Sequence, residues 1–211
     1  MTATTAVRSD ATVRGTVVLG IVDGVADTNP VFEGRIRRML AANGIDAPDP
    51  DDWCRLNDVV AAVEEVTDRV GTATLKHAAR SLPARMPWPG TVSTVGDAMV
   101  ALPDVYDALH RDHGGRVEFE FTAERSGYLR CVTPYPPSML FGLVRGIGKR
   151  FGTGTGFVAI DRLAGEGNET TFHLKWWGPR EVAVRSSPSV APSTTPDAEW
   201  QTPRRTEPVE H

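Results

Sequence analysis

Apolar residues recur at helical spacing through the first half of the chain. The pattern predicts a helix over residues 28–44, with Thr28 or Asn29 as its cap, Pro30 in its first turn and Gly44 at its end. The residues that form its apolar stripe are Phe32, Ile36, Met39 and Leu40.

Further helices are predicted up to the glycine pair at residues 114 and 115. One covers residues 58–71, where valines about one turn apart form a single stripe, and a shorter piece follows over residues 72–81. Ser93 is expected to cap a short helix that meets Pro103, because proline interrupts a helix or begins a new one. A further helix is therefore predicted from Pro103 to Gly114.

The period of the pattern changes after residue 115. Residues 116–122 alternate strictly, with Val117, Phe119 and Phe121 on one face and glutamates on the other, which is typical of a half-buried strand. The returning strand and the two strands of a second hairpin are predicted over residues 128–133, 157–163 and 170–177.

These elements predict an α+β fold class, with N-terminal helices followed by a β-β-α-β-β antiparallel sheet unit. We divide the chain into an N-terminal segment (1–24), an α+β ligand-binding-like domain (25–178) and a tail (179–211). The tail is rich in Pro, Ser and Thr and poor in large apolar residues, so its composition predicts disorder.

Composition argues against several functions. The 211 residues carry a formal net charge of −4, so no basic excess attracts nucleic acid. The apolar stretch at residues 16–27 contains Asp23 and is too short to span a bilayer, and the start lacks the apolar core of a signal peptide. Cys54 and Cys131 are isolated thiols, which suits a reducing compartment. We expect a cytoplasmic protein with no nucleic-acid partner and no membrane span.

A glycine-rich stretch from Cys131 to Gly156 invites comparison with a phosphate-binding loop. The Walker A pattern G-x-x-x-x-G-K-[ST] fails at both ends, because Leu143 stands where a glycine is needed and Arg150 where a hydroxyl is needed. The dinucleotide fingerprint fails where Phe151 replaces its third glycine. The stretch therefore does not predict a nucleotide site.

The same stretch predicts a packed helix that Ser138 caps. Its apolar face consists of Leu140, Leu143, Val144, Ile147 and Phe151. Gly142 and Gly146 lie together four residues apart, and two glycines inside a helix imply that another backbone or a ligand comes close. The side chains expected to project mostly to solvent are Arg145, Lys149 and Arg150.

Histidines and cysteines raise the question of a metal site. His110 and His113 stand three apart at a helix end, yet a metal needs further ligands. Strand alternation places Cys131 inward and His173 outward, so the two do not readily join one site. We predict that the histidines cap the helix C-terminus, and that the chain holds no metal and no cofactor.

Several stretches together resemble a known family. They are "DTNPVFEGRIRRMLAANGIDAPDPDDW", "VGTATLKH", "YDALHRDHGGRVEFEF", "CVTPYPPSMLFGLVRGIGKRFG" and "TTFHLKW". Over residues 25–177 the chain resembles uncharacterised prokaryotic proteins related to the 4-vinyl-reductase-like and haem-NO-binding-like ligand-binding superfamily. The resemblance implies an α+β ligand-binding or sensory domain, often dimeric, with a pocket between helices and sheet.

The chain also departs from those relatives. Pro137 and the Thr170–Thr171 pair stand where many relatives carry cysteines. The Tyr-x-Ser-x-Arg signature of the haem-binding branch begins at none of Tyr106, Tyr128 and Tyr135. Neither a metal nor haem is therefore carried over.

The leading hypothesis is a non-enzymatic small-molecule-binding or sensory domain with an apolar pocket between helices and sheet. Its partners would be an unknown small hydrophobic ligand and, from the resemblance, a second copy of the chain. One alternative is a reductase-like enzyme on an unsaturated or tetrapyrrole-like substrate, with His110 or Tyr135 as the acid. Another is a structural or adaptor dimer. The residues expected at the pocket are Tyr106, Phe119, Tyr135, Met139 and Phe172, with His110 as a polar contact.

Overall fold

The structure, a computed structural model, describes residues 10–28, 30–112, 114–152, 157–163 and 169–177. The chain divides into two units, residues 1–181 and 182–211, and all described residues belong to the first. The predicted tail and His113 lie outside the described residues.

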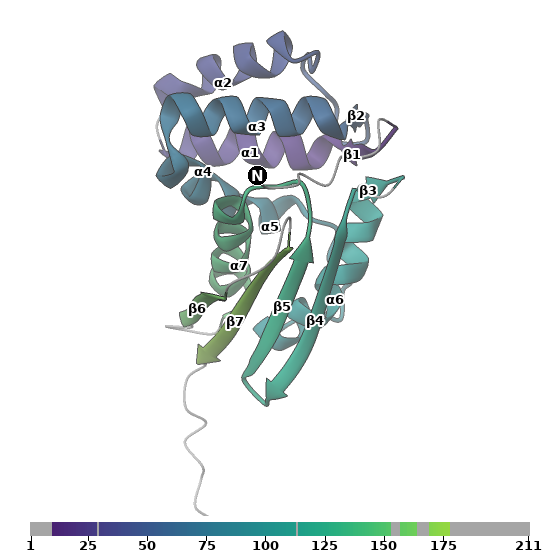
Figure 1. The fold of residues 1–211 in the computed structure, drawn as a ribbon, viewed down its shortest axis with the longest axis vertical. Coiled ribbons are helices and arrows are strands. Elements are labelled where there is room, and N and C mark those ends of the chain that lie inside the picture. Colours follow the sequence, from purple (N-terminus) through teal and green to yellow (C-terminus); the bar gives the residue numbers. More distant parts are fainter. Residues whose placement is uncertain (1–9, 29, 113, 153–156, 164–168, 178–211) are drawn as a thin grey trace, which may run out of the picture. The chain divides into compact units, whose positions relative to one another are not determined.

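Helices come first in the chain and most strands follow, so the predicted α+β class is confirmed (Figure 1). The helical elements are α1 (Gly15–Thr28), α2 (Pro30–Ala42), α3 (Leu56–Val70), α4 (Thr72–Ala78), the 3-10 turn η1 (Ala79–Ser81), α5 (Leu82–Arg85), α6 (Val95–Leu109) and α7 (Pro137–Phe151). The strands are β1 (Thr12–Arg14), β2 (Trp53–Arg55), β3 (His110–Arg111), β4 (Arg116–Ala123), β5 (Ser126–Val132), β6 (Phe157–Leu163) and β7 (Glu169–Trp177).

The strands form two antiparallel sheets. In the small sheet, β1 lies between β2 and β3, so Val13 pairs with both Cys54 and His110. In the large sheet the order is β4-β5-β7-β6, and α7 connects β5 to β6. This is the β-β-α-β-β unit that the sequence predicts. The small sheet was not predicted, because its strands have only two or three residues.

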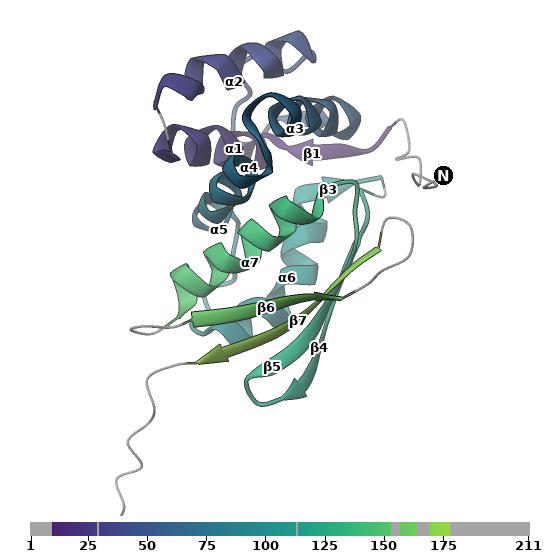
Figure 2. The same ribbon diagram turned by 60° about the vertical axis from the view of Figure 1, so that its left-hand side comes forward.

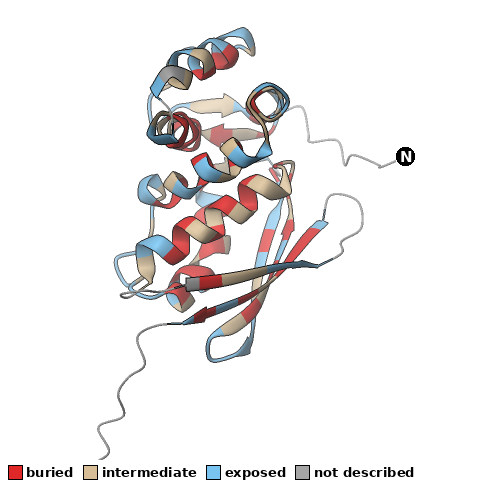
Figure 3. Cartoon of the chain, turned by 90° about the vertical axis from the view of Figure 1, so that its left-hand side faces the viewer, coloured by how far each residue is buried: buried red, intermediate tan, exposed pale blue. Residues whose placement is uncertain are grey.

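The large sheet buries one face against α6 and α7 (Figure 2). Leu129 pairs with Phe172, and both side chains are fully buried beneath the helices. Tyr128 and His173 pair on the opposite face, as strand alternation requires. Figure 3 shows the buried positions gathered where the helices and the sheet meet.

Helix α1 was absent from the sequence-based prediction. It is apolar on most sides, and it packs by close backbone approach: a Cβ on Gly24 would lie 2.0 Å from the carbonyl oxygen of Ala78 in α4. Its three glycines and its many β-branched residues have low helix propensity, so the local sequence does not indicate a helix. It continues past residue 24, where the first boundary was drawn, and the division into domains stays a prediction. Within the described residues, no helix combines the length and apolar character needed to cross a bilayer.

Helix α6 corrects two further expectations. It runs unbroken through Pro103, which was expected to separate two helices. Its N-cap is Thr94, not Ser93: the Thr94 hydroxyl accepts from the Asp97 N–H, and the Asp97 carboxylate accepts from the Thr94 N–H, which completes a capping box. The capped start and buried face hold the helix together despite the proline.

Helix α7 confirms the packing interpretation of the glycine-rich stretch. A Cβ on Gly142 would lie 2.3 Å from the Lys76 carbonyl oxygen, and one on Gly146 would lie 2.4 Å from the Arg80 carbonyl oxygen. Both glycines therefore let α7 approach the backbone of α4 and η1.

Two details of this helix differ from the prediction. Pro136 is the N-cap and no side chain caps the helix, so Ser138 does not have the expected role. Arg145 does not project to solvent: its guanidinium donates to the Val158 carbonyl at 3.2 Å, whereas Lys149 and Arg150 are exposed.

Candidate functional site

The candidate site forms where α6 ends. His110 directly follows the helix and begins β3, so backbone pairing with Val13 fixes its position. Tyr106 precedes it by one helical turn, and the two rings stack with centroids 3.9 Å apart. Tyr135 comes from the loop before α7, and its ring meets that of His110 edge-on at 5.6 Å. The fold thus brings together three residues that the sequence separates into two groups.

Hydrogen bonds define the state of the His110 ring. Its Nδ1 lies 2.8 Å from the Tyr106 carbonyl oxygen, and because a carbonyl only accepts, Nδ1 carries the proton and donates. Its Nε2 lies 2.8 Å from the Tyr135 hydroxyl and accepts from it. The Tyr106 hydroxyl donates to the Gly114 carbonyl at 2.6 Å. Every polar ring atom of the three residues has a partner. The predicted capping of α6 by His110 is confirmed, since its ring bonds a carbonyl in the last turn.

Burial keeps these groups uncharged at neutral pH. It lowers the pKa of His110 to about 4, against which the hydrogen bond to the Tyr106 backbone acts only in part. It raises the pKa of Tyr135 and that of Tyr106 well above the usual range, with neighbouring acidic groups adding to both effects. His110 therefore caps α6 as a neutral imidazole and not as the cation that a C-terminal dipole would favour.

A small apolar cavity of about 40 Å³ adjoins this network. Seven of its ten lining residues belong to α1, α5, α6 and α7, so the cavity lies among these helices and not beneath the large sheet. Its lining residues are Val17, Leu82, Met86, Tyr106, Leu109, His110, Tyr135, Met139, Leu140 and Leu143.

The structure brings four of the six predicted pocket residues together at this cavity: Tyr106, His110, Tyr135 and Met139. Phe119 and Phe172 do not line it. Phe172 is fully buried under the helices, and Phe119 packs against Phe121 with ring centroids 5.0 Å apart. These two aromatics fill the space between sheet and helices in which the pocket was expected.

Sequence reasoning missed most of the aliphatic wall. Leu140 and Leu143 belong to the apolar stripe predicted for residues 138–151, but the stripe does not reveal which members meet a cavity. Val17 lies on the unpredicted α1, and Met86 lies in a proline-rich loop without periodicity.

The possible metal ligands are dispersed. Among the described residues, no group of three or more His, Cys, Asp or Glu side chains converges on one point. Cys131 is buried, and His173 lies on the other face of the sheet beside Tyr128, as predicted. Burial also raises the pKa of Cys131 to about 12, so this thiol stays protonated.

Comparisons with known proteins bear on the fold. No family model matches the chain, and no curated protein matches it. Among solved structures, it is similar to an oxygen-binding H-NOX domain related to soluble guanylate cyclases, with 12% identity and a TM-score of 0.58 over 79% of this chain and 96% of that chain. A single-residue mutant of the T. Tengcongensis H-NOX gives 12% identity and a TM-score of 0.59 over 79% and 99% of the two chains.

A third similar structure belongs to work on haem redox potential and porphyrin distortion. It has 11% identity and a TM-score of 0.57, and covers 90% of this chain and 100% of that chain. At these identities the comparisons establish an H-NOX-like fold and nothing about chemistry. They support the haem-NO-binding-like part of the resemblance at the level of fold, and its 4-vinyl-reductase-like part stays a prediction.

The fold raises the question of whether haem fits this site. Haem iron needs an axial ligand atom, yet both His110 nitrogens already have partners. The cavity of about 40 Å³ is also far smaller than the roughly 300 Å³ at which ligand pockets usually begin. The residues around His110 therefore do not fit a haem, and no role for one is derived.

Proposed function

We propose that the protein is a non-enzymatic small-molecule-binding or sensory domain whose ligand is a small hydrophobic molecule. The observation that carries this proposal is the wholly apolar cavity beside the Tyr106–His110–Tyr135 network. Apolar cavities of this kind stay dry and take apolar guests. The volume restricts the guest to a molecule of a few heavy atoms.

The wall of the cavity supports a sensory role. Met86 and Met139 have unbranched, adaptable side chains that can move for a guest. His110 links the cavity to the small sheet through β3, and Tyr135 links it to the start of α7. A guest that displaces the Tyr135 ring would therefore shift both strand β3 and the start of helix α7. Binding would stabilise the native state by an amount that grows with the logarithm of the ligand concentration above Kd.

The experiment is to release and identify what the purified protein retains. Protein is denatured, and the extract is analysed by gas chromatography with mass spectrometry. We expect one small apolar compound from the natural chain and none from Leu143→Phe, in which the larger ring fills the cavity. Leu163→Phe, on the exposed part of β6, is the matched control and should retain the compound. Equal retention by all three proteins would contradict the proposal.

No observation at the site favours the other hypotheses over this one. A reductase-like enzyme would need His110 or Tyr135 as its acid, but burial keeps His110 neutral and raises the pKa of the Tyr135 hydroxyl, which makes both poor proton donors at neutral pH. It would also need a hydride donor, for which the sequence carries no recognisable motif. The expected homodimer and the expected cytoplasmic location stay predictions, to be tested by sedimentation and by fractionation.

A further inference from the structure

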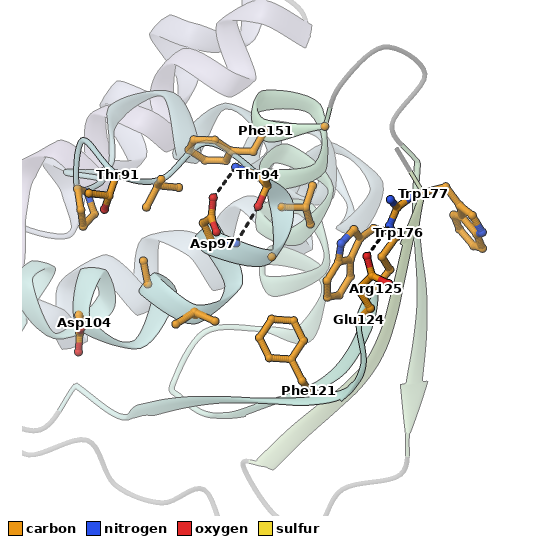
Figure 4. Close-up of a pocket in the computed structure, with 17 residues that line it drawn as sticks. Thr91, Thr94, Asp97, Asp104, Phe121, Glu124, Arg125, Phe151, Trp176 and Trp177 are labelled. Atoms are coloured by element: carbon orange, nitrogen blue, oxygen red, sulfur yellow. Dashed lines mark hydrogen bonds and ion pairs between the residues drawn. The ribbon is translucent and has the colours of Figure 1, made fainter. Parts of the chain in front are cut away.

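A second and larger hollow lies on the surface, away from the His110 cavity. This groove has a volume of about 850 Å³ and runs between α6, the turn joining β4 to β5, the end of β7 and the end of α7 (Figure 4). The residues that matter for its chemistry are Val100, Asp104, Phe121, Glu124, Trp176 and Trp177.

The groove concentrates exposed apolar surface. Among the described residues, the large exposed hydrophobic side chains are Val100 (55%), Phe121 (48%), Trp177 (50%) and Leu163 (40%). All but Leu163 line the groove. Phe121 also packs on Trp176 with ring centroids 6.1 Å apart, so the apolar floor is held in place. A gathered apolar patch with a polar rim is typical of an interaction surface.

Charge at the rim decides which kind of partner fits. The rim carries the carboxylates of Asp97, Asp104 and Glu124 against a single guanidinium, that of Arg125. Asp97 is engaged in the α6 capping box, and Glu124 lies 3.9 Å from Arg125. An acidic rim repels nucleic-acid phosphates and anionic lipid headgroups. In a symmetric dimer through this groove, the same carboxylates would face each other.

We infer that the groove docks a peptide segment of a partner protein, with an apolar centre and arginine or lysine on either side. Asp104 and Glu124 lie toward opposite ends of the groove with Phe121 between them (Figure 4), which matches that order of charges. Phe121 and Trp176 receive the apolar centre. This surface is separate from the proposed ligand cavity. It would let a sensory domain contact a downstream partner protein.

The test uses a short fluorescein-labelled peptide with arginines at both ends of a proline- and leucine-rich centre. Fluorescence anisotropy is measured with the full chain at low and high salt. We expect saturable binding that weakens as salt rises, because the rim charges are screened. Phe121→Ser should weaken binding about tenfold or more, as loss of a central aromatic contact does. Asp104→Asn combined with Glu124→Gln should weaken binding and flatten its salt dependence.

Controls distinguish specific binding in the groove from nonspecific binding to exposed hydrophobic surface. Leu163→Ser removes an exposed hydrophobic side chain outside the groove and should leave the affinity unchanged. A peptide with glutamates in place of the arginines should not bind. Thermal melts confirm that each variant is folded. Equal binding of both peptides, no saturable binding, or concentration-dependent self-association that Phe121→Ser abolishes would each overturn the inference.

Discussion

At the scale of single residues, His110 couples its protonation to folding. Its pKa is about 4 in the folded chain and 6.5 when unperturbed, so between these values the unfolded chain binds more protons. The contribution of His110 to the free energy of unfolding is therefore fully present above pH 6.5 and is lost as the pH drops toward 4. The shift corresponds to a loss of about 3 kcal/mol in the free energy of unfolding. Urea denaturation at a series of pH values measures it.

The variant His110→Gln isolates this effect from that of other titrating groups. Glutamine keeps a hydrogen-bonding side chain but does not titrate. The difference in unfolding free energy between the two proteins should therefore change by about 3 kcal/mol from pH 6.5 to pH 4. A difference that stays constant over this range would show that His110 is not held neutral.

Tyr135 gives a second prediction at this scale. Tyr135→Phe removes the hydroxyl that donates to Nε2 of His110 and leaves a buried acceptor without its partner. We expect a loss of about 1–3 kcal/mol in the free energy of unfolding. Tyr128→Phe on the open face of the sheet is the matched control and should change stability by about 0.5 kcal/mol or less. Similar losses in both variants would contradict the buried network.

Sequence could predict part of this site and not the rest. Tyr106 and His110 stand one helical turn apart, so their proximity follows from the helix alone. The bond from Tyr135 to His110 joins residues 25 apart in sequence, across a hairpin, and depends on tertiary packing. Phe119 and Phe172 were expected at the pocket because they are aromatic and inward-facing, which describes a filled core equally well.

At the scale of elements, the contact between α7 and η1 depends on glycine. Gly146→Ala would place a Cβ 2.4 Å from the Arg80 carbonyl oxygen, so the backbones must separate. We expect a loss of about 1–3 kcal/mol from overpacking, although alanine favours helix more than glycine does. Lys149→Ala on the exposed side of α7 should cost about 0.5 kcal/mol or less. Denaturant midpoints of the two variants test this, and a stabilised Gly146→Ala would refute the close contact.

Elements whose pattern agrees with local propensity were predictable, and the others were not. Strands β4 to β7 and helices α2, α3 and α7 alternate or repeat clearly because each meets both core and solvent. Helix α1 combines three glycines with many β-branched residues, which have low helix propensity, so the local sequence does not indicate a helix. Pro103 suggested a break in α6, but tertiary packing and the Thr94 capping box outweigh that local preference.

At the scale of the described fold, order of elements and strand pattern were enough to predict the α+β class. The position of the cavity was not, because it depends on which apolar side chains leave a gap. The large sheet and its helices fill the space between them, and the gap lies among the helices beside His110. The proposed function therefore requires that this gap binds a ligand.

Methyl NMR under xenon pressure tests this claim most directly. In protein labelled at the methionine methyls, xenon serves as a small apolar probe. Met86 and Met139 line the cavity, whereas Met99 is fully buried elsewhere. We predict saturable shifts of the Met86 and Met139 signals, no shift of Met99, and loss of the response in Leu143→Phe. Unchanged Met86 and Met139 signals, or equal shifts at all three methionines, would contradict a binding site at this cavity.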